Sequence, residues 1–149
     1  MCIRDSYRIE PEIKQNLAAM GFKRPTDIQF KAIPPILNGE DVLAIAQTGT
    51  GKTAAFAIPI LHMLHEQKRS RRTEGIKCVV MEPTRELALQ ITEVFDSIGK
   101  HTRVKTLCVF GGVEQDPQIA RLEKGIDILV ATPGPVSYTH LTLPTILRV

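Results

Sequence analysis

Short, continuous runs of apolar residues recur along this chain, and a segment of helical character separates each run from the next. Within the runs, apolar and polar residues do not alternate, so both faces of each expected strand should be buried. Such strands, separated by helices, are typical of a parallel sheet covered on both faces. The predicted fold is therefore α/β, an open and mostly parallel sheet that binds ligands at the carboxyl ends of its strands. The expected strands are residues 42–46, 76–81, 104–110 and 126–131.

Periodic apolar positions and capping residues indicate the helices between these strands. Thr26 and Gln29 have the T-x-x-Q form of a capping box, and Pro34 and Pro35 should disturb or end the helix that it opens. A polar loop is expected over residues 65–75. The expected helices are residues 11–20, 26–37, 52–64, 84–98 and 117–124. The inner face of the helix at 84–98 is expected to hold Leu87, Ile91, Val94, Phe95 and Ile98.

Composition is that of an ordinary globular domain. A length of 149 residues suits one hydrophobic core, and 43% hydrophobic with 23% charged residues argues against fibrous or disordered classes. No apolar stretch reaches the roughly 20 residues that a bilayer span needs. The net charge of +3 is too small to indicate nucleic-acid binding. Cys78 and Cys108 lie in apolar runs without metal-ligand spacing, which favours buried free thiols and a reducing, cytoplasmic setting.

The segment that joins the first expected strand to its helix carries the clearest chemistry. Gly49 and Gly51 let its backbone curl so that several N–H groups point into one concavity, beside the positive end of a helix dipole. Lys52 can reach the β- and γ-phosphates, and the Thr53 hydroxyl is placed to bind Mg²⁺. The segment therefore predicts nucleoside triphosphate binding rather than a glycine-rich turn without a ligand. It reads Ala46-Gln47-Thr48-Gly49-Thr50-Gly51-Lys52-Thr53, a phosphate-loop pattern with alanine first.

Five segments together resemble the motifs of DEAD-box RNA helicases. They stand in the order of that family, and the resemblance covers residues 7–134. It implies the N-terminal RecA-like domain of a helicase core, which is a P-loop NTPase fold. The stretch from Gly111 to Gly134 most resembles the bacterial RhlE-type subgroup. The matching segments are residues 21–29 (Q motif), 46–53 (motif I), 83–90 (motif Ia), 111–112 (the Gly-Gly motif) and 132–134 (motif Ib).

The resemblance implies ATP as the nucleotide, bound with Mg²⁺. In the family, the glutamine that matches Gln29 reads the adenine edge and the residue that matches Thr26 supports it. Spacing alone favours a helix-capping role for Gln29. The capping role and the adenine-binding role are compatible, because one amide can serve the helix start in one state and the base in another. Lys52 and Thr53 are the implied catalytic residues, with Thr53 holding the metal through ATP. The implied ATP-binding residues are Phe22, Thr26, Gln29, Thr48, Gly49, Thr50, Gly51, Lys52, Thr53 and Ala54.

The resemblance also implies a site for the sugar–phosphate backbone of single-stranded RNA. Contacts of that kind are blind to base sequence and are weakened by salt. Without the resemblance, residues 83–86 would favour only a capped helix start. The implied RNA-binding residues are Pro83, Thr84, Arg85, Gly111, Gly112, Thr132, Pro133 and Gly134.

Two further clusters favour structural interpretations. The basic residues of 68–72 favour a solvated loop over an RNA-binding patch, because charge-rich loops are usually surface. His62 and His65 favour ordinary helix positions over metal ligands.

The hydrolytic motifs of the family do not occur in this sequence. It has no Asp-Glu-Ala-Asp or Ser-Ala-Thr segment, and the second RecA-like domain, an implied partner, is not in it. Phosphoryl transfer needs an acidic residue beside Mg²⁺ and a cation to meet the developing charge. Residues 1–6 and 135–149 depart from the family pattern, with Pro135 where an arginine is usual. We expect them to be a non-native leader and tail around a partial ATP-binding domain at 7–134.

The sequence thus predicts part of an ATP-dependent RNA helicase, monomeric, that binds MgATP and RNA but neither hydrolyses ATP nor unwinds a duplex alone. Two alternatives stay open. One is a small-molecule phosphotransferase in which residues 68–72 form a lid, and the other is a non-catalytic RNA-binding module gated by nucleotide.

Overall fold

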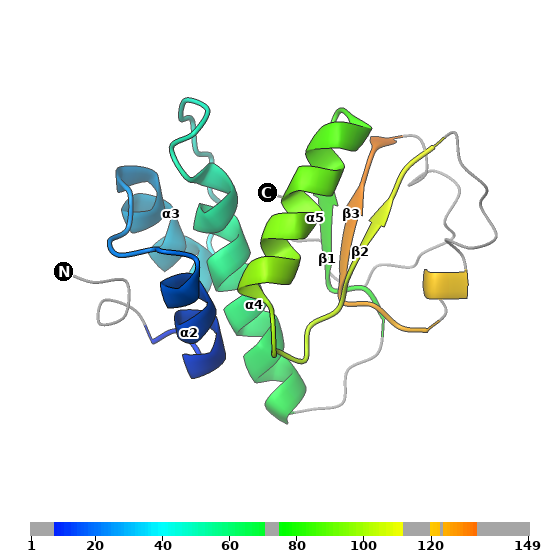
Figure 1. Cartoon of the computed structure of the whole chain (residues 1–149), viewed down its shortest axis with the longest axis horizontal. Coiled ribbons are helices and arrows are strands. Elements are labelled where there is room, and N and C mark those ends of the chain that lie inside the picture. The colour runs from blue at the N-terminus through cyan, green and yellow to red at the C-terminus, as the bar shows by residue number, and fades with distance from the viewer. Residues whose placement is uncertain (1–7, 71–74, 112–119, 123, 134–149) are drawn as a thin grey trace.

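The computed structural model describes residues 8–70, 75–111, 120–122 and 124–133. Figure 1 shows α5 lying across the sheet, α4 beside α5, and α2 and α3 beyond α4. The described elements are α2 (Pro11–Ala19), α3 (Asp27–Leu37), α4 (Lys52–Ser70), β1 (Cys78–Met81), α5 (Arg85–Ile98), β2 (Thr106–Val109) and β3 (Ile128–Ala131).

The three strands form a parallel sheet in the order β1-β3-β2. Their register is level, because Met81 and Val109 both pair with Ala131 at the carboxyl ends. The ladder continues past the strands, where the Glu82 N–H donates to the Ala131 carbonyl at 2.9 Å. The strand ends and the starts of α4 and α5 lie together toward the top of Figure 1. The predicted α/β fold with a parallel sheet is confirmed.

Both faces of this sheet are packed, as the continuous apolar runs predict. One face meets α2, α4 and α5 through a core that contains Cys78, Val80, Ile128 and Val130. The opposite face forms a second cluster, against which Leu122 packs. That cluster consists of Ile76, Leu107, Val109, Ile126, Leu129 and Ala131.

Helix α5 begins and ends close to where its sequence predicts. Thr84 is its N-cap, and the Thr84 hydroxyl accepts the N–H of Leu87 at 3.3 Å. Phe95 and Ile98 are fully buried. The expected inner position of Leu87 is wrong, because Leu87 is 39% exposed and Ala88 is buried in its place. The other four predicted inner positions, Ile91, Val94, Phe95 and Ile98, do pack on the core.

The strand expected over residues 42–46 is not formed. Leu43 is 92% exposed and Ile45 is 90% exposed, so the run contributes little to the core. A parallel strand is stable only when neighbours satisfy its N–H and C=O groups. Among the described residues, the run pairs with neither edge of the three-stranded sheet. The apolar pattern is that of a strand, but the pairing partner that would make it one is lacking in this part of the chain.

Helix α4 continues to Ser70, six residues beyond its predicted end at Leu64, so the loop expected from residue 65 is wrong. Two contacts hold the added turns. Lys68 Nζ lies 2.7 Å from Asp127 Oδ2, and Arg69 donates to Glu10 at 2.8 Å. In α3, Pro34 and Pro35 remove two backbone donors without ending the helix, which continues to Leu37.

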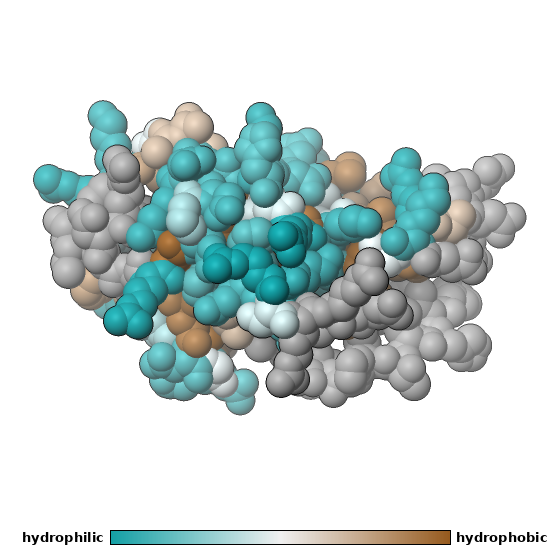
Figure 2. Space-filling view, turned by 90° about the horizontal axis from the view of Figure 1, so that it is seen from below, coloured by the Kyte–Doolittle hydropathy of each residue, from teal (hydrophilic) through white to brown (hydrophobic). Residues whose placement is uncertain are grey.

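The face at which α4 ends is mainly hydrophilic where residues are described, as Figure 2 shows from below. Over the same ranges, no helix combines the length and apolar character that crossing a membrane demands.

Candidate functional site

The phosphate loop turns sharply and leads directly into α4. Gly49 and Gly51 adopt left-handed backbone conformations with φ of 79° and 84°, which favour glycine. Lys52 opens the helix, and its Nζ donates to the Ala46 carbonyl at 2.6 Å. Thr50 closes the turn by donating from its hydroxyl to the Gln47 carbonyl at 2.7 Å. The loop is thus curled as predicted, with the lysine folded back across it.

Gln29 joins the start of α3 to this loop. Its Oε1 accepts the Thr26 N–H at 3.1 Å, and its Nε2 donates to the Gly51 carbonyl at 3.2 Å. The two partners fix the orientation of the amide, because one end faces a donor and the other an acceptor. Gln29 is only 1% exposed. The capping role predicted from spacing is confirmed, and the same amide reaches the phosphate loop.

A cleft of about 400 Å³ opens between the start of α3 and the loop. Its volume falls within the usual range for small-ligand sites. Gln29, Lys52 and Thr53 are not among the residues that line it. Its lining residues are Thr26, Asp27, Ile28, Lys31, Ile45, Ala46 and Thr50.

Of the expected ATP-binding residues, Thr26 and Thr50 line this cleft, whereas Phe22 and Ala54 serve the core. Phe22 is half-buried against the main hydrophobic cluster and does not line the cleft. Ala54 is buried in the first turn of α4, so only its backbone could face a phosphate. Thr48 is exposed at the tip of the loop, and Lys52 and Thr53 are half-buried at the start of the helix.

The second predicted surface is the edge where the strands end. Pro83, Thr84 and Arg85 follow β1 and are exposed, whereas Thr132 follows β3 and is half-buried. The Thr132 N–H donates to the Val109 carbonyl at 3.3 Å, which ties the end of β3 to that of β2. Gly111 and Pro133 are exposed nearby, while Gly112 and Gly134 lie outside the described residues.

Phe110 also belongs to this edge, although its sequence pattern does not mark it as a site residue. The Arg85 guanidinium carbon lies 4.3 Å from the centre of the Phe110 ring. An aromatic residue at the end of an apolar run reads as core, so nothing in the pattern marks it as the partner of an arginine 25 positions earlier. The signal that could have found it is its place between the third strand and Gly111.

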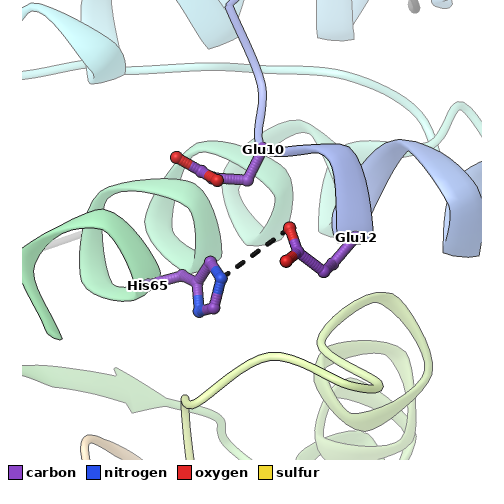
Figure 3. Close-up of side chains that lie close together, drawn as sticks. All are labelled: Glu10, Glu12 and His65. Atoms are coloured by element: carbon purple, nitrogen blue, oxygen red, sulfur yellow. Dashed lines mark ion pairs between the residues drawn. The ribbon is translucent and has the colours of Figure 1, made fainter. Parts of the chain in front are cut away.

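A separate cluster lies toward the other end of α4. Glu10, Glu12 and His65 present ligand atoms within 4.8 Å of one another, and Figure 3 shows the His65 ring directed at the Glu12 carboxylate. His65 is 3% exposed, and its Nε2 lies 3.8 Å from Glu12 Oε2 with no hydrogen-bond partner. Arg69 already pairs with Glu10 at 2.8 Å.

The tautomer of His65 argues against a metal at this cluster. Its Nδ1 accepts the Arg103 N–H at 3.1 Å, so the neutral ring carries its proton on Nε2, toward Glu12. A metal-binding Nε2 must be bare, and the proton would then have to sit on Nδ1, against the amide hydrogen of Arg103. The arrangement fits a buried histidine that donates toward a carboxylate. Close by, burial lowers the pKa of His62, an effect that Glu66 and Glu10 partly offset.

Lys68, expected in a solvated loop, has a structural role instead. Its Nζ bonds the Asp127 carboxylate at 2.7 Å and the Arg103 carbonyl at 3.0 Å. Asp127 is 3% exposed and also accepts the Lys105 N–H at 2.8 Å. The network joins the end of α4 to the beginnings of β2 and β3, so Lys68 is held at the opposite end of α4 from the phosphate loop. Residues 71 and 72 of the basic cluster lie outside the described residues.

A parallel α/β sheet, a glycine loop opening a helix and a cleft beside that loop define a P-loop NTPase domain with a RecA-like fold. The comparisons with known proteins are more specific. Residues 26–147 match the family described as DEAD/DEAH box helicase. The chain belongs to this family.

Among curated relatives, the DEAD-box ATP-dependent RNA helicase RhpA of Helicobacter pylori is 44% identical over 126 residues, which are 85% of this chain and 24% of that protein. The probable ATP-dependent RNA helicase DDX17 of Mus musculus is 45% identical over 113 residues, 76% of this chain and 17% of that protein. The chain therefore spans a quarter or less of the length of these relatives.

Solved structures agree on the fold. A DEAD box protein from Methanococcus jannaschii superposes with a TM-score of 0.80 at 38% identity, covering 90% of this chain and 35% of that one. A hypothetical ATP-dependent RNA helicase from Sulfolobus tokodaii gives a TM-score of 0.74 at 40% identity, covering 87% and 35%.

Proposed function

We propose that this chain is the ATP-binding part of an ATP-dependent RNA helicase. It holds MgATP at residues 46–53 beside the start of α3, and it holds the backbone of single-stranded RNA at the ends of the strands. The observation that carries the proposal is the hydrogen bond between Gln29 and Gly51, which joins the glutamine expected to read adenine to the loop expected to hold phosphates.

The nucleotide site fits a magnesium triphosphate. The left-handed glycines curl the loop without adding side chains of their own, and the start of α4 adds its dipole. Lys52 must leave the Ala46 carbonyl to meet a phosphate, and the hydroxyl of Thr53 supplies an oxygen ligand for Mg²⁺. When bound, Mg²⁺ would neutralise phosphate charge and orient the triphosphate.

The RNA site is supported by its exposure and its charge. Arg85 lies at the start of α5, where the helix dipole also favours an anion, and Pro83, Thr84 and Pro133 leave the backbone around it open to solvent. Gly112 and Gly134 remain part of the proposal through the family resemblance alone.

Turnover by this chain alone is not expected, because no Asp-Glu-Ala-Asp segment supplies the carboxylate that holds Mg²⁺ and orients water. The phosphotransferase alternative needs residues 68–72 to form a lid over the phosphates, and the position of Lys68 contradicts such a lid. Lys68 lies sixteen residues along α4 from Lys52, roughly 24 Å at the helical rise of about 1.5 Å per residue, and it is bonded to Asp127.

Several finer assignments belong to the same proposal. They are membership of the RhlE-type subgroup, a second RecA-like domain as partner, a monomeric state and a cytoplasmic location. Each follows from the resemblance or from the composition.

Calorimetric titration with MgATP and with MgGTP tests the nucleotide site. We expect binding of MgATP to be tighter than that of MgGTP, and Lys52→Ala to abolish binding of both. Gln29→Ala should remove the preference for adenine, whereas Gln15→Ala, an exposed helical glutamine, and Lys100→Ala, an exposed lysine, should change neither affinity. Equal affinities for the two nucleotides, with circular dichroism showing folded protein, would contradict the assignment of Gln29.

A phosphate-release assay on the same preparations tests turnover. We expect no release above the level of Lys52→Ala. Steady release that Lys52→Ala abolishes would show that the chain hydrolyses ATP unaided.

A further inference from the structure

We infer that Phe110 is a positioning residue for the RNA site, acting through Arg85. The inference rests on the proposed RNA-binding role of the strand-end edge. It adds a residue that neither the family motifs nor the sequence pattern identifies as part of the site.

The pair bridges the sheet. Arg85 follows β1 and Phe110 directly follows β2, and these strands flank β3 on its two sides. Because Met81, Ala131 and Val109 are level, the three strand ends stand side by side. With its guanidinium carbon 4.3 Å from the Phe110 ring centre, Arg85 joins the segment that follows β1 to the segment that follows β2.

The geometry of a guanidinium explains why this contact prepares Arg85 for a phosphate. The ring attracts the flat face of the cation, whereas its N–H groups lie in its plane and point outward. A phosphate is bound through that N–H edge, often by two parallel hydrogen bonds. Stacking on Phe110 therefore does not consume the donors that RNA needs.

The contact also reduces the conformational entropy that the Arg85 side chain would lose on binding RNA. An exposed arginine is a long and mobile side chain, and immobilising it opposes binding. Arg85 is exposed at the start of α5, and Phe110 confines it to one region over the sheet edge before any ligand arrives. The half-buried Phe110 itself is held by the end of β2.

RNA affinity of the full chain, measured by fluorescence anisotropy with a short labelled uridine oligonucleotide, tests the inference. Phe110→Leu should weaken binding about two- to five-fold, the worth of an exposed cation–π pair. Phe110→Tyr keeps the aromatic face and should bind like the unchanged chain. In an Arg85→Ala background, Phe110→Leu should produce no further loss, because the residue acts only through the arginine.

Nuclear magnetic resonance supplies a readout that a merely structural role would not move. The Arg85 side-chain protons should show the upfield displacement of protons above an aromatic ring. Phe110→Leu should abolish that displacement, while the amide resonances of the core remain in place.

The outcomes separate this inference from the function on which it rests. If Arg85→Ala leaves RNA affinity unchanged, the RNA site at this edge is wrong. If Arg85→Ala weakens binding but Phe110→Leu does not, or weakens it equally with and without Arg85, the RNA site stands and the positioning role is overturned. Tighter binding by Phe110→Leu would show that the ring competes with RNA for the arginine, which also overturns it.

Discussion

Gln29 and Gly51 are joined by a hydrogen bond of 3.2 Å between the glutamine amide and the glycine carbonyl, across 22 positions of the chain. The bond ties the start of α3 to the last turn of the phosphate loop. A structural change in either segment should therefore affect the other. The proposed adenine-binding glutamine and the proposed phosphate-binding loop form one unit.

Alanine in place of Gly51 should disrupt this unit more than alanine in place of Gly49. Both positions have left-handed φ, which costs an L residue about 1–2 kcal/mol. Only at Gly51 would the new Cβ also lie 2.5 Å from Gln29 Nε2. We therefore expect urea denaturation to show a greater loss of unfolding free energy for Gly51→Ala. The excess should shrink in a Gln29→Ala background, and equal losses for the two glycines would contradict the close approach.

Lys68→Met should destabilise the fold by about 2–4 kcal/mol, because it leaves the Asp127 carboxylate without its charged partner. The Asp127 side chain is only 5% exposed. Arg69→Met is the matched control, since Arg69 is 57% exposed and its pair should be worth about 0–1 kcal/mol. Chemical denaturation of both variants measures the difference. Equal losses would mean that Lys68 behaves as the solvated residue that its sequence suggests.

Cys78 should resist thiol reagents that modify Cys108. Burial raises the pKa of Cys78 to about 12, so almost none of this thiol ionises at neutral pH. Burial also raises the pKa of Cys108, but that residue is only half-buried. Iodoacetamide treatment of the native chain followed by peptide mass spectrometry should find Cys108 modified first. Modification of Cys78 at a similar rate would show that the face of β1 toward α4 and α5 is open.

Glu82→Gln should stabilise the chain at neutral pH. Burial raises the pKa of Glu82 above that of a glutamate in the unfolded chain, so the folded state holds this proton more tightly than the unfolded state does. Stability therefore falls as pH rises from that value through the folded pKa, and the penalty persists above it. The substitution removes the penalty.

Thermal unfolding across a pH series measures this effect. The gain from Glu82→Gln should be present at neutral pH and vanish in acid, where the carboxyl is protonated in both states. Glu93→Gln, on the exposed surface of α5, should give no such pH-dependent gain. A gain in thermal stability of constant size at every pH would show that the effect arises from packing rather than from ionisation.

The sequence predicted those helices that are specified by their own caps and apolar spacing. It also predicted those strands whose pairing partners are among the described residues. Helix α5 follows from its Thr84 cap and its apolar spacing, and β1, β2 and β3 follow from apolar runs that find one another. The loop at Gly49 and Gly51 follows from residue type, because few other residues adopt those backbone angles.

Distant partners account for what the sequence could not reveal. The length of α4 depends on Lys68 meeting Asp127 and Arg69 meeting Glu10, each 59 positions apart. The partnership of Arg85 with Phe110 depends on strand order, which places β1 and β2 on either side of β3. The error at residues 42–46 has the same cause, since an apolar run specifies a preference for pairing but not the neighbour that satisfies it.

The exposure of Leu43 and Ile45 leaves the phosphate loop held less firmly on its incoming side than on its outgoing side. Its outgoing leg is the first turn of α4, buried through Ala54 and Ala55. Its incoming leg packs through Val42 but pairs with no strand among the residues that the structure describes. A triphosphate entering such a loop has to fix the incoming leg itself, and the entropy of doing so is subtracted from its affinity. A strand laid against residues 42–46 would therefore tighten nucleotide binding without touching the nucleotide.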